Sequence, residues 1–157
     1  GVEALGVEPA GPGAARRLLG EGRIVGLLPG GMRESLRPSR ERYQTRWQKR
    51  RGFVRLAIEA QVPIILCACP AADDIYTVYP SVVTKVGYKK LKLPLPIARG
   101  LGMTAVPRPV RLTHYLAPAI SPPPLDPERL EAQVEEFHPR VLEAMDRLMV
   151  RALKAQK

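Results

Sequence analysis

Apolar runs alternate with segments of helical spacing along this chain, and that alternation limits the folds open to it. The apolar run 24–28 is followed by a helical pattern over 47–60 and then by a second apolar run over 62–69. Strands separated by helical segments pair in parallel, because the helix returns the chain to the same end of the sheet. The pattern predicts an α/β fold with a mostly parallel sheet flanked by helices, in which 62–69 lies beside 24–28.

The helical segments carry start and break signals. Pro12 stands at the first position of a short helix, where its missing N–H has no cost. Asp126 precedes a proline at the start of a final helical region, as expected of an N-cap. Pro139 is expected to kink or split that region, because it removes a helical hydrogen bond.

Composition narrows the class of protein. The 157 residues are 45% hydrophobic and 25% charged, which fits one globular domain. A net charge of +10 favours an anionic partner, whether nucleic acid, a membrane surface or a phosphorylated substrate. Aromatic residues make up only 5% of the chain, too few for the stacking surface of a single-strand binder, so nucleic acid is disfavoured.

Two cysteines, Cys67 and Cys69, stand two residues apart on the second apolar run. In a strand they would share one face, and we expect that face to lie in the core. No disulfide and no metal site is expected from them. The sequence contains no apolar stretch long enough to span a membrane and no signal peptide, and the lack of an initiator methionine leads us to expect a longer protein.

A Pro-Gly-Gly turn ends the first apolar run. Glycines at Gly30 and Gly31 let backbone amides approach an anion closely, and Arg33 can add a bidentate fork to phosphate or carboxylate. The competing interpretation is an ordinary tight turn followed by a solvated ion pair between Arg33 and Glu34. Taken alone, the turn does not decide between them.

The stretch from 73 to 102 leaves two interpretations open. Residues 75–86 have the spacing of an amphipathic helix broken at Pro80, and 88–97 mixes lysines with bulky apolar side chains. That mixture suits a membrane interface, where lysine stems reach the headgroups. It equally suits a long surface connection over the core. Residues 108–116 then alternate apolar and polar side chains, as a half-buried edge strand does.

These motifs and their order resemble the later half of a glycerolipid acyltransferase domain of the lysophospholipid acyltransferase superfamily. That superfamily carries a Phe-Pro-Glu-Gly-Thr-Arg block, matched here by Pro29, Gly31 and Arg33, and a Val-Pro-Ile block, matched by residues 62–64. Gly30 stands in the place of the usual glutamate. Together with the glutamate after Arg33, this departure resembles the branch of type-two diacylglycerol acyltransferases and transmembrane protein 68.

The resemblance implies an O-acyltransferase of glycerolipid metabolism and phospholipid biosynthesis, associated with the cytoplasmic face of a membrane. It would move a fatty acyl group from an acyl thioester, on coenzyme A or acyl carrier protein, to a hydroxyl of a glycerolipid or lysophospholipid, with no cofactor. Residues 1–157 would be the C-terminal portion of a single domain, with the sheet and site in 1–120 and a terminal helical region in 121–157. The implied substrate-binding residues are Pro29, Gly30, Gly31, Arg33 and Glu34.

Each implied residue has an expected role. The backbone of Gly30 and Gly31 and the side chain of Arg33 would cradle the polar head of the acceptor. Glu34 would order the arginine or the loop. The basic helix around Lys49 to Arg55 would attract phosphate or an acyl carrier.

The superfamily's His-x-x-x-x-Asp block, in which histidine acts as general base toward the acceptor hydroxyl, is absent from this chain. His114 has no acid at that spacing, and His138 with Glu143 has the spacing but lies in the terminal helix, which we interpret as coincidence. We therefore expect the catalytic pair upstream of Gly1 and this chain alone to be inactive. The alternative function is a non-catalytic basic module that binds nucleic acid or anionic membrane, marked by salt-dependent affinity for DNA or RNA.

Overall fold

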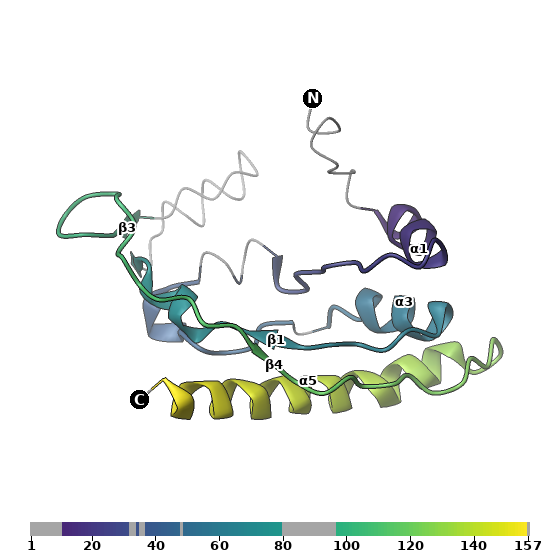
Figure 1. Ribbon diagram of the computed structural model, residues 1–157. Coiled ribbons are helices and arrows are strands. Elements are labelled where there is room, and N and C mark those ends of the chain that lie inside the picture. Colours follow the sequence, from purple (N-terminus) through teal and green to yellow (C-terminus); the bar gives the residue numbers. More distant parts are fainter. Residues whose placement is uncertain (1–10, 32–33, 35–36, 48, 80–96, 157) are drawn as a thin grey trace. The chain divides into compact units, whose positions relative to one another are not determined.

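The computed structural model describes residues 11–31, 34, 37–47, 49–79 and 97–156 (Figure 1). The chain divides into two compact units whose segments interleave along the sequence. The first unit is built from residues 1–29, 49–65 and 118–141, and the second from 30–48, 66–117 and 142–157. The long helix α5, Leu130–Ala155, contributes its first part to one unit and its remainder to the other.

Three helices build the first unit: α1 (Pro12–Gly20), α3 (Gly52–Ala60) and the start of α5. Arg16 of α1 forms an ion pair with Glu59 of α3 at 2.6 Å, and Arg51 at the start of α3 pairs with Glu135 of α5 at 2.7 Å. The core between the helices is apolar. Its buried members include Val54, Leu56, Ala57, Ile58, Val134, Phe137 and Val141.

The helices expected from local signals are present. The short helix at Pro12 is confirmed, and the helix expected over 47–60 is confirmed from Gly52 onward. It ends where Gln61 turns to a left-handed φ of 52° and its side-chain amide donates to the carbonyl oxygens of Ile58 at 2.7 Å and Pro123 at 2.9 Å.

The strand expected over 24–28 is wrong for the described structure. Residues 23–28 have neither helical nor strand hydrogen bonding, Ile24 is fully exposed and Leu28 is also exposed. An apolar run shows only that a segment could be buried as a strand, whereas a strand also needs a neighbour to pair with. Here the run forms part of a pocket wall instead.

The second unit contains two antiparallel pairs of short strands. One joins β1 (Cys67–Ala68) to β4 (Tyr115–Leu116), and the other joins β2 (Thr77–Tyr79) to β3 (Ile97–Arg99). Two 3-10 helices, η2 (Ser39–Glu41) and η3 (Pro70–Asp74), lie in the same unit.

The strand pairing differs from the expected one. The run 62–69 pairs through an isolated bridge between Ile64 and Ile120 and through β1 with β4, both antiparallel, and not with 24–28. Cys67 is exposed, so the expectation of a buried cysteine face is wrong for that residue. All pairings among the described residues are antiparallel, and the mostly parallel sheet stays a prediction.

Two other segments differ from expectation. Residues 77–79 form a strand rather than the first turn of an amphipathic helix, and the lysine-rich stretch from 88 to 96 lies outside the described residues. Of the strand expected over 108–116, only Tyr115–Leu116 is paired as one.

Helix α5 runs without a break through Pro139, so the expected split is wrong. Proline removes one helical hydrogen bond, and the buried side chains on both sides of it, Phe137 and Val141, stabilise the helical conformation against that loss. The helix begins at Leu130, because Asp126 is occupied in a preceding turn, where its carboxylate accepts the N–H of Glu128 at 3.1 Å. Within the described ranges, no helix is long and apolar enough to cross a bilayer.

Candidate functional site

The Pro-Gly-Gly motif forms a turn in which glycine is required for space. Gly30 is buried, and a Cβ atom placed on it would overlap the side-chain carboxylate of Glu34. Gly31 follows with a φ of 54°, a conformation that costs glycine little. The turn therefore folds directly against the side chain of Glu34, four residues after Gly30.

Glu34 is held in that position by three groups. Its carboxylate accepts the backbone N–H of Arg46 at 3.1 Å and the indole N–H of Trp47 at 3.2 Å, and it lies 3.6 Å from the guanidinium of Arg37. Trp47 is buried, so its N–H needs a partner within the protein. These contacts connect Glu34, in the segment that follows the motif, to residues 46–47.

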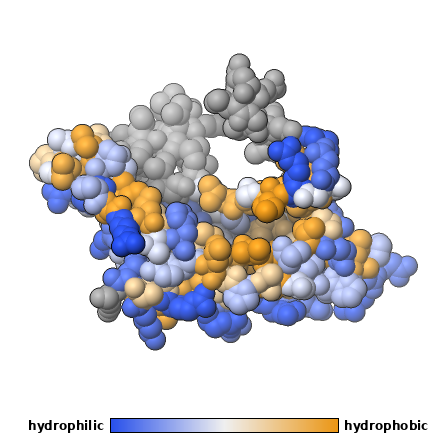
Figure 2. Space-filling model, in the orientation of Figure 1, coloured by the Kyte–Doolittle hydropathy of each residue, from blue (hydrophilic) through white to orange (hydrophobic). Residues whose placement is uncertain are grey.

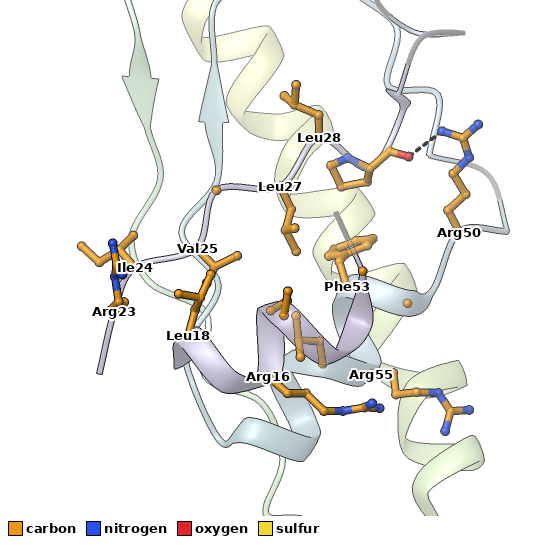
Figure 3. Close-up of a pocket in the computed structure, with 17 residues that line it drawn as sticks. Arg16, Leu18, Arg23, Ile24, Val25, Leu27, Leu28, Arg50, Phe53 and Arg55 are labelled. Carbon is orange, nitrogen blue, oxygen red and sulfur yellow. Dashed lines mark hydrogen bonds between the residues drawn. The ribbon is translucent and has the colours of Figure 1, made fainter. Parts of the chain in front are cut away.

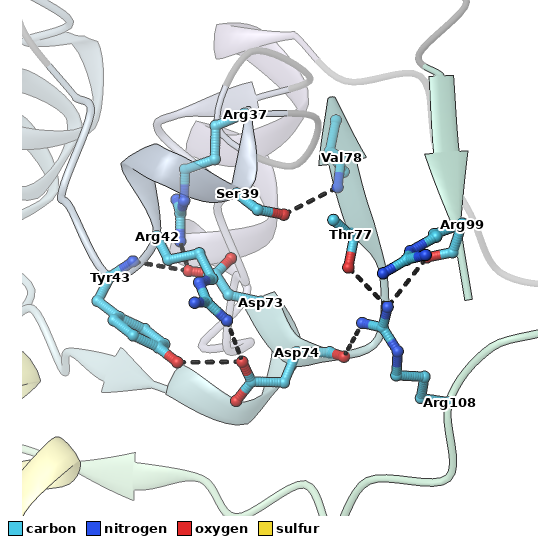
Figure 4. A network of polar contacts seen from close by, with 10 residues as sticks. All are labelled: Arg37, Ser39, Arg42, Tyr43, Asp73, Asp74, Thr77, Val78, Arg99 and Arg108. Carbon is cyan, nitrogen blue, oxygen red and sulfur yellow. Dashed lines mark hydrogen bonds and ion pairs between the residues drawn. The ribbon is translucent and has the colours of Figure 1, made fainter. Parts of the chain in front are cut away.

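Arg37 extends this linkage to a second acidic residue (Figure 4). Its guanidinium forms an ion pair with Asp73, and the same carboxylate accepts the backbone N–H of Tyr43 at 2.8 Å. The side chains of Arg37 and Asp73 are only 11% and 17% exposed. Tyr43 has a φ of 64°, unusual for a residue with a side chain, and the Asp73 hydrogen bond stabilises that conformation.

Asp74 organises the other half of this network. Its carboxylate accepts hydrogen bonds from the Tyr43 hydroxyl and from Arg42, both at 3.0 Å. Burial, and then the hydrogen bond to Asp74, raise the pKa of Tyr43, so the phenol stays protonated as a donor. The network therefore connects residues 37–43, which follow the motif segment, to the two aspartates at 73–74.

The residues predicted for substrate binding are only partly brought together in the described structure. Pro29 and Gly30 lie in the turn, Gly31 and Glu34 are helical, and Arg33 lies outside the described residues. Sequence reasoning missed Arg37, Tyr43 and Asp73 as supports. Arg37 and Asp73 are 36 positions apart, and nothing in the local sequence of either one indicates the other.

The first unit contains a pocket of about 710 Å³ between α1, the segment 23–29 and α3 (Figure 3). Its size lies within the range of pockets that bind small ligands. Apolar side chains form much of its wall, and these include Leu18, Val25, Leu27, Phe53 and Leu56. The exposed apolar run that was expected to be a strand contributes one side of this wall.

Four arginines also line the pocket: Arg16, Arg23, Arg50 and Arg55. Arg16 and Arg55 are neutralised by Glu59 and Glu131. Arg50 donates to the carbonyl oxygen of Pro29 at 2.7 Å, and no described carboxylate pairs with Arg50 or Arg23. The pocket therefore combines apolar walls with two positive charges that lack a counter-ion within the described chain.

The two histidines do not form a catalytic pair in the described structure. His114 is exposed next to β4. His138 is buried in α5 with its Nε2 atom unpartnered among described residues, and its ring meets Phe53 edge-on at a centroid distance of 6.0 Å. Five residues of helix place His138 and Glu143 about 140° apart. No described group of His, Cys, Asp and Glu could hold a metal ion.

Burial gives His138 a measurable effect on stability. Burial, and then the positive charge of Arg51, lower the pKa of His138, against a smaller opposing effect of the backbone of Arg50. The unfolded chain therefore binds the proton more readily than the folded chain does. We expect the free energy of unfolding to be highest above about pH 6.5, the unfolded pKa, and to fall as the pH is lowered toward the folded pKa.

Urea unfolding of the full chain between about pH 8 and about pH 5 measures this effect. The His138→Leu variant should lose that part of the pH dependence which His138 contributes. Identical pH profiles for the two proteins would show that His138 has the same pKa in both states.

The sequence of this chain is similar to that of known proteins from one family. Residues 17–114 match the family model described as diacylglycerol acyltransferase, a range that contains both the Pro-Gly-Gly motif and residues 62–64. A Homo sapiens protein named "DGAT1/2-independent enzyme synthesizing storage lipids" is 30% identical over 130 residues, which are 82% of this chain and 37% of that protein. Its Gallus gallus counterpart is 33% identical over 95 residues, 60% of this chain and 28% of the relative.

A Bos taurus protein of the same name is 46% identical over 48 residues, 31% of this chain and 14% of the relative. The chain spans about a third of the length of the human and chicken relatives. No solved structure matches it. Because the family model covers more than half of its residues, the chain belongs to the diacylglycerol acyltransferase family.

Proposed function

We propose that this chain supplies the substrate-binding part of a membrane-associated glycerolipid acyltransferase. The observation that carries the proposal is the pocket of the first unit, in which apolar walls and two arginines without counter-ions occur together. An acyl chain needs the first feature and an anionic head group needs the second. Membership of the diacylglycerol acyltransferase family supports the same chemistry.

In the pocket, the apolar side chains of α1, α3 and residues 25–27 would surround an acyl chain. Removing that chain from water stabilises the complex in proportion to the apolar area buried. Arg23 and Arg50 would bind the phosphate or carboxylate at its head, since their guanidinium groups can donate paired hydrogen bonds.

In the Pro-Gly-Gly loop, the backbone of Gly30 and Gly31 and the side chain of Arg33 would hold the polar head of the acyl acceptor. The support for this role is the match of these residues to the superfamily block and the tight folding of the turn against Glu34. Glu34 acts here as a positioning residue, because its carboxylate is already bound by Arg46 and Trp47.

The transfer itself would move an acyl group from a coenzyme A or carrier-protein thioester to a hydroxyl of the acceptor. The acceptor oxygen forms a bond to the thioester carbonyl carbon as a general base takes the hydroxyl proton, and the bond from that carbon to sulfur then breaks. The thiolate leaves and receives the proton, so the products are the ester and the free thiol. Since residues 1–157 hold no His-x-x-x-x-Asp block, we propose that this base is supplied by sequence outside them.

Lipid binding to the full chain tests the proposal. Arg23→Gln and Arg50→Gln should each weaken the binding of a lysophosphatidate in the pocket by about tenfold, because each removes a charge-assisted hydrogen bond to the head group. Arg33→Ala tests the Pro-Gly-Gly motif separately, and the acceptor should again bind about tenfold more weakly. Fluorescent lysophosphatidate, acyl-coenzyme A and uncharged monoacylglycerol, each below its micelle concentration, separate an acceptor head group from a thioester donor.

The matched control is Arg147→Gln, since Arg147 pairs with Glu143 on α5 and lies outside the pocket lining. It should bind the lipids as the unaltered chain does. If none of the three lipids binds to the folded chain, or if all four variants lose affinity equally, the proposed site is wrong.

A further inference from the structure

The loop between β3 and Arg108 exposes apolar side chains at its tip. Leu101 is 56% exposed, Met103 84% and Val106 55%, all within six residues. Figure 1 shows this loop leaving β3, and Figure 2 shows apolar atoms mixed with polar ones in that part of the second unit. Soluble proteins expose single apolar side chains freely, but a cluster of them marks a contact surface.

The backbone of this loop is hydrogen-bonded within the loop itself. The N–H of Gly100 donates to Thr104 at 2.7 Å, that of Leu101 to Val106 at 2.8 Å, and that of Thr104 back to Leu101 at 3.2 Å. A Cβ atom on Gly100 would overlap the Val106 carbonyl, so glycine permits this closure. Polar backbone groups that are paired internally cost little to move into an apolar environment.

Arginines flank the loop along the chain, with Arg99 before it and Arg108 and Arg111 after it. Arg108 donates to the Asp74 carbonyl at 3.0 Å and to the Thr77 hydroxyl at 2.6 Å, and these bonds anchor the chain where it leaves the loop (Figure 4). Arg99 and Arg111 are exposed, and no carboxylate of the described chain pairs with either. Arg99 instead approaches the sulfur of Met103 at 3.6 Å.

We propose that loop 100–106 is a membrane contact, in which Leu101, Met103 and Val106 enter the boundary between head groups and acyl chains while Arg99 and Arg111 bind anionic head groups. In a bilayer that contains anionic lipid, apolar acyl chains lie beneath negatively charged head groups. The loop carries apolar side chains at its tip and arginines in the residues on either side, so its apolar part can enter the acyl region while the arginines stay at the head groups. The inference rests on the proposed function in one respect, that the substrates reside in a bilayer.

Sedimentation of the full chain with phosphatidylcholine vesicles, with and without phosphatidylserine, tests the proposal. Leu101→Asp and Met103→Asp should each lower the partition coefficient by about tenfold, because burial of the apolar side chain is lost and an anion is added. Val150→Asp is the matched control, since Val150 is 53% exposed on α5 and receives the same charge. It should change partitioning much less.

A second measurement does not depend on these aspartates. In Met103→Trp, vesicles should shift the tryptophan emission to shorter wavelength, relative to the unaltered chain with its buried Trp47. Arg111→Gln should weaken binding only to vesicles that contain phosphatidylserine.

Equal losses in Leu101→Asp and Val150→Asp, or no spectral shift in Met103→Trp, would overturn the membrane contact. Capture of a soluble protein by the loop without vesicle binding would also overturn it. Binding of dispersed lysophosphatidate should be unchanged in the loop variants, so failure of the pocket proposal and failure of this one give different results.

Discussion

Replacing Asp73 with alanine should lower the free energy of unfolding by about 3 kcal/mol, the largest effect we expect from a single polar substitution in this chain. The substitution leaves the guanidinium of Arg37, whose side chain is 11% exposed, without its nearest carboxylate. It also removes the acceptor for the N–H of Tyr43, a residue held at a φ of 64°. Urea unfolding monitored by the fluorescence of Trp47 measures the change, since Trp47 lies in the same unit.

The control for the Asp73 substitution is a solvent-exposed ion pair, because water can solvate either charge after its partner is removed. Glu143→Ala removes the partner of Arg147, and the two side chains are 71% and 65% exposed, so the expected loss is below about 1 kcal/mol. The double variant Arg37→Met with Asp73→Ala should lose less than the sum of the two single losses, because no unpaired charge is left. Equal losses at Asp73 and Glu143 would show that the network contributes no more than a surface pair.

Gly30→Ala should destabilise the chain by about 2 kcal/mol, the cost of forcing an extra methyl group into filled space. The new Cβ atom would overlap the Glu34 carboxylate, which would have to leave the N–H groups of Arg46 and Trp47. The emission of Trp47 should therefore change together with the unfolding midpoint.

Gly26→Ala serves as the control for this substitution, because nothing lies within 4 Å of a Cβ atom at Gly26. Its unfolding midpoint should stay close to that of the unaltered chain. In the Gly30→Ala background, Glu34→Ala should cost less than it does in the unaltered chain, since the overlap is relieved. If the two losses add without coupling, Gly30 is not limited by Glu34.

The helices of this chain could be predicted more fully than its strands. The signals of α1 and α3 are local, namely a proline at the first position and apolar residues repeating at helical spacing. The pairing of residues 62–69 depends on residues about 50 positions away, such as Ile64 with Ile120, and no local pattern specifies that partner. The split expected at Pro139 is wrong, because the packing of Phe137 and Val141 depends on distant residues and is not part of a helix propensity.

In the candidate site too, features with local sequence signals could be predicted, and features that depend on distant residues could not. The turn at Gly30 and Gly31 follows from residue types, and the sequence also indicated that Glu34 would order the loop, a role that stays a proposal. The pocket could not be predicted, because it requires α1, residues 23–29 and α3 to come together. Arg50 lies in the basic segment 49–55 that was expected to attract phosphate, but neither it nor Arg23 is distinguished from the other arginines of the pocket until the glutamates that neutralise Arg16 and Arg55 are located.

The carboxylate that fills the space beside Gly30 also bears on how this loop can change through evolution. A chain with glutamate at position 30 and this same backbone conformation would place its Cβ atom where the Glu34 carboxylate already lies, and would add a second carboxylate to the same short segment. The overlap costs stability, and two like charges close together raise the pKa of one of them. Positions 30 and 34 should therefore covary: a lineage gains glutamate at 30 only when it gives up glutamate at 34, and the intermediate that carries both is the least stable step between them.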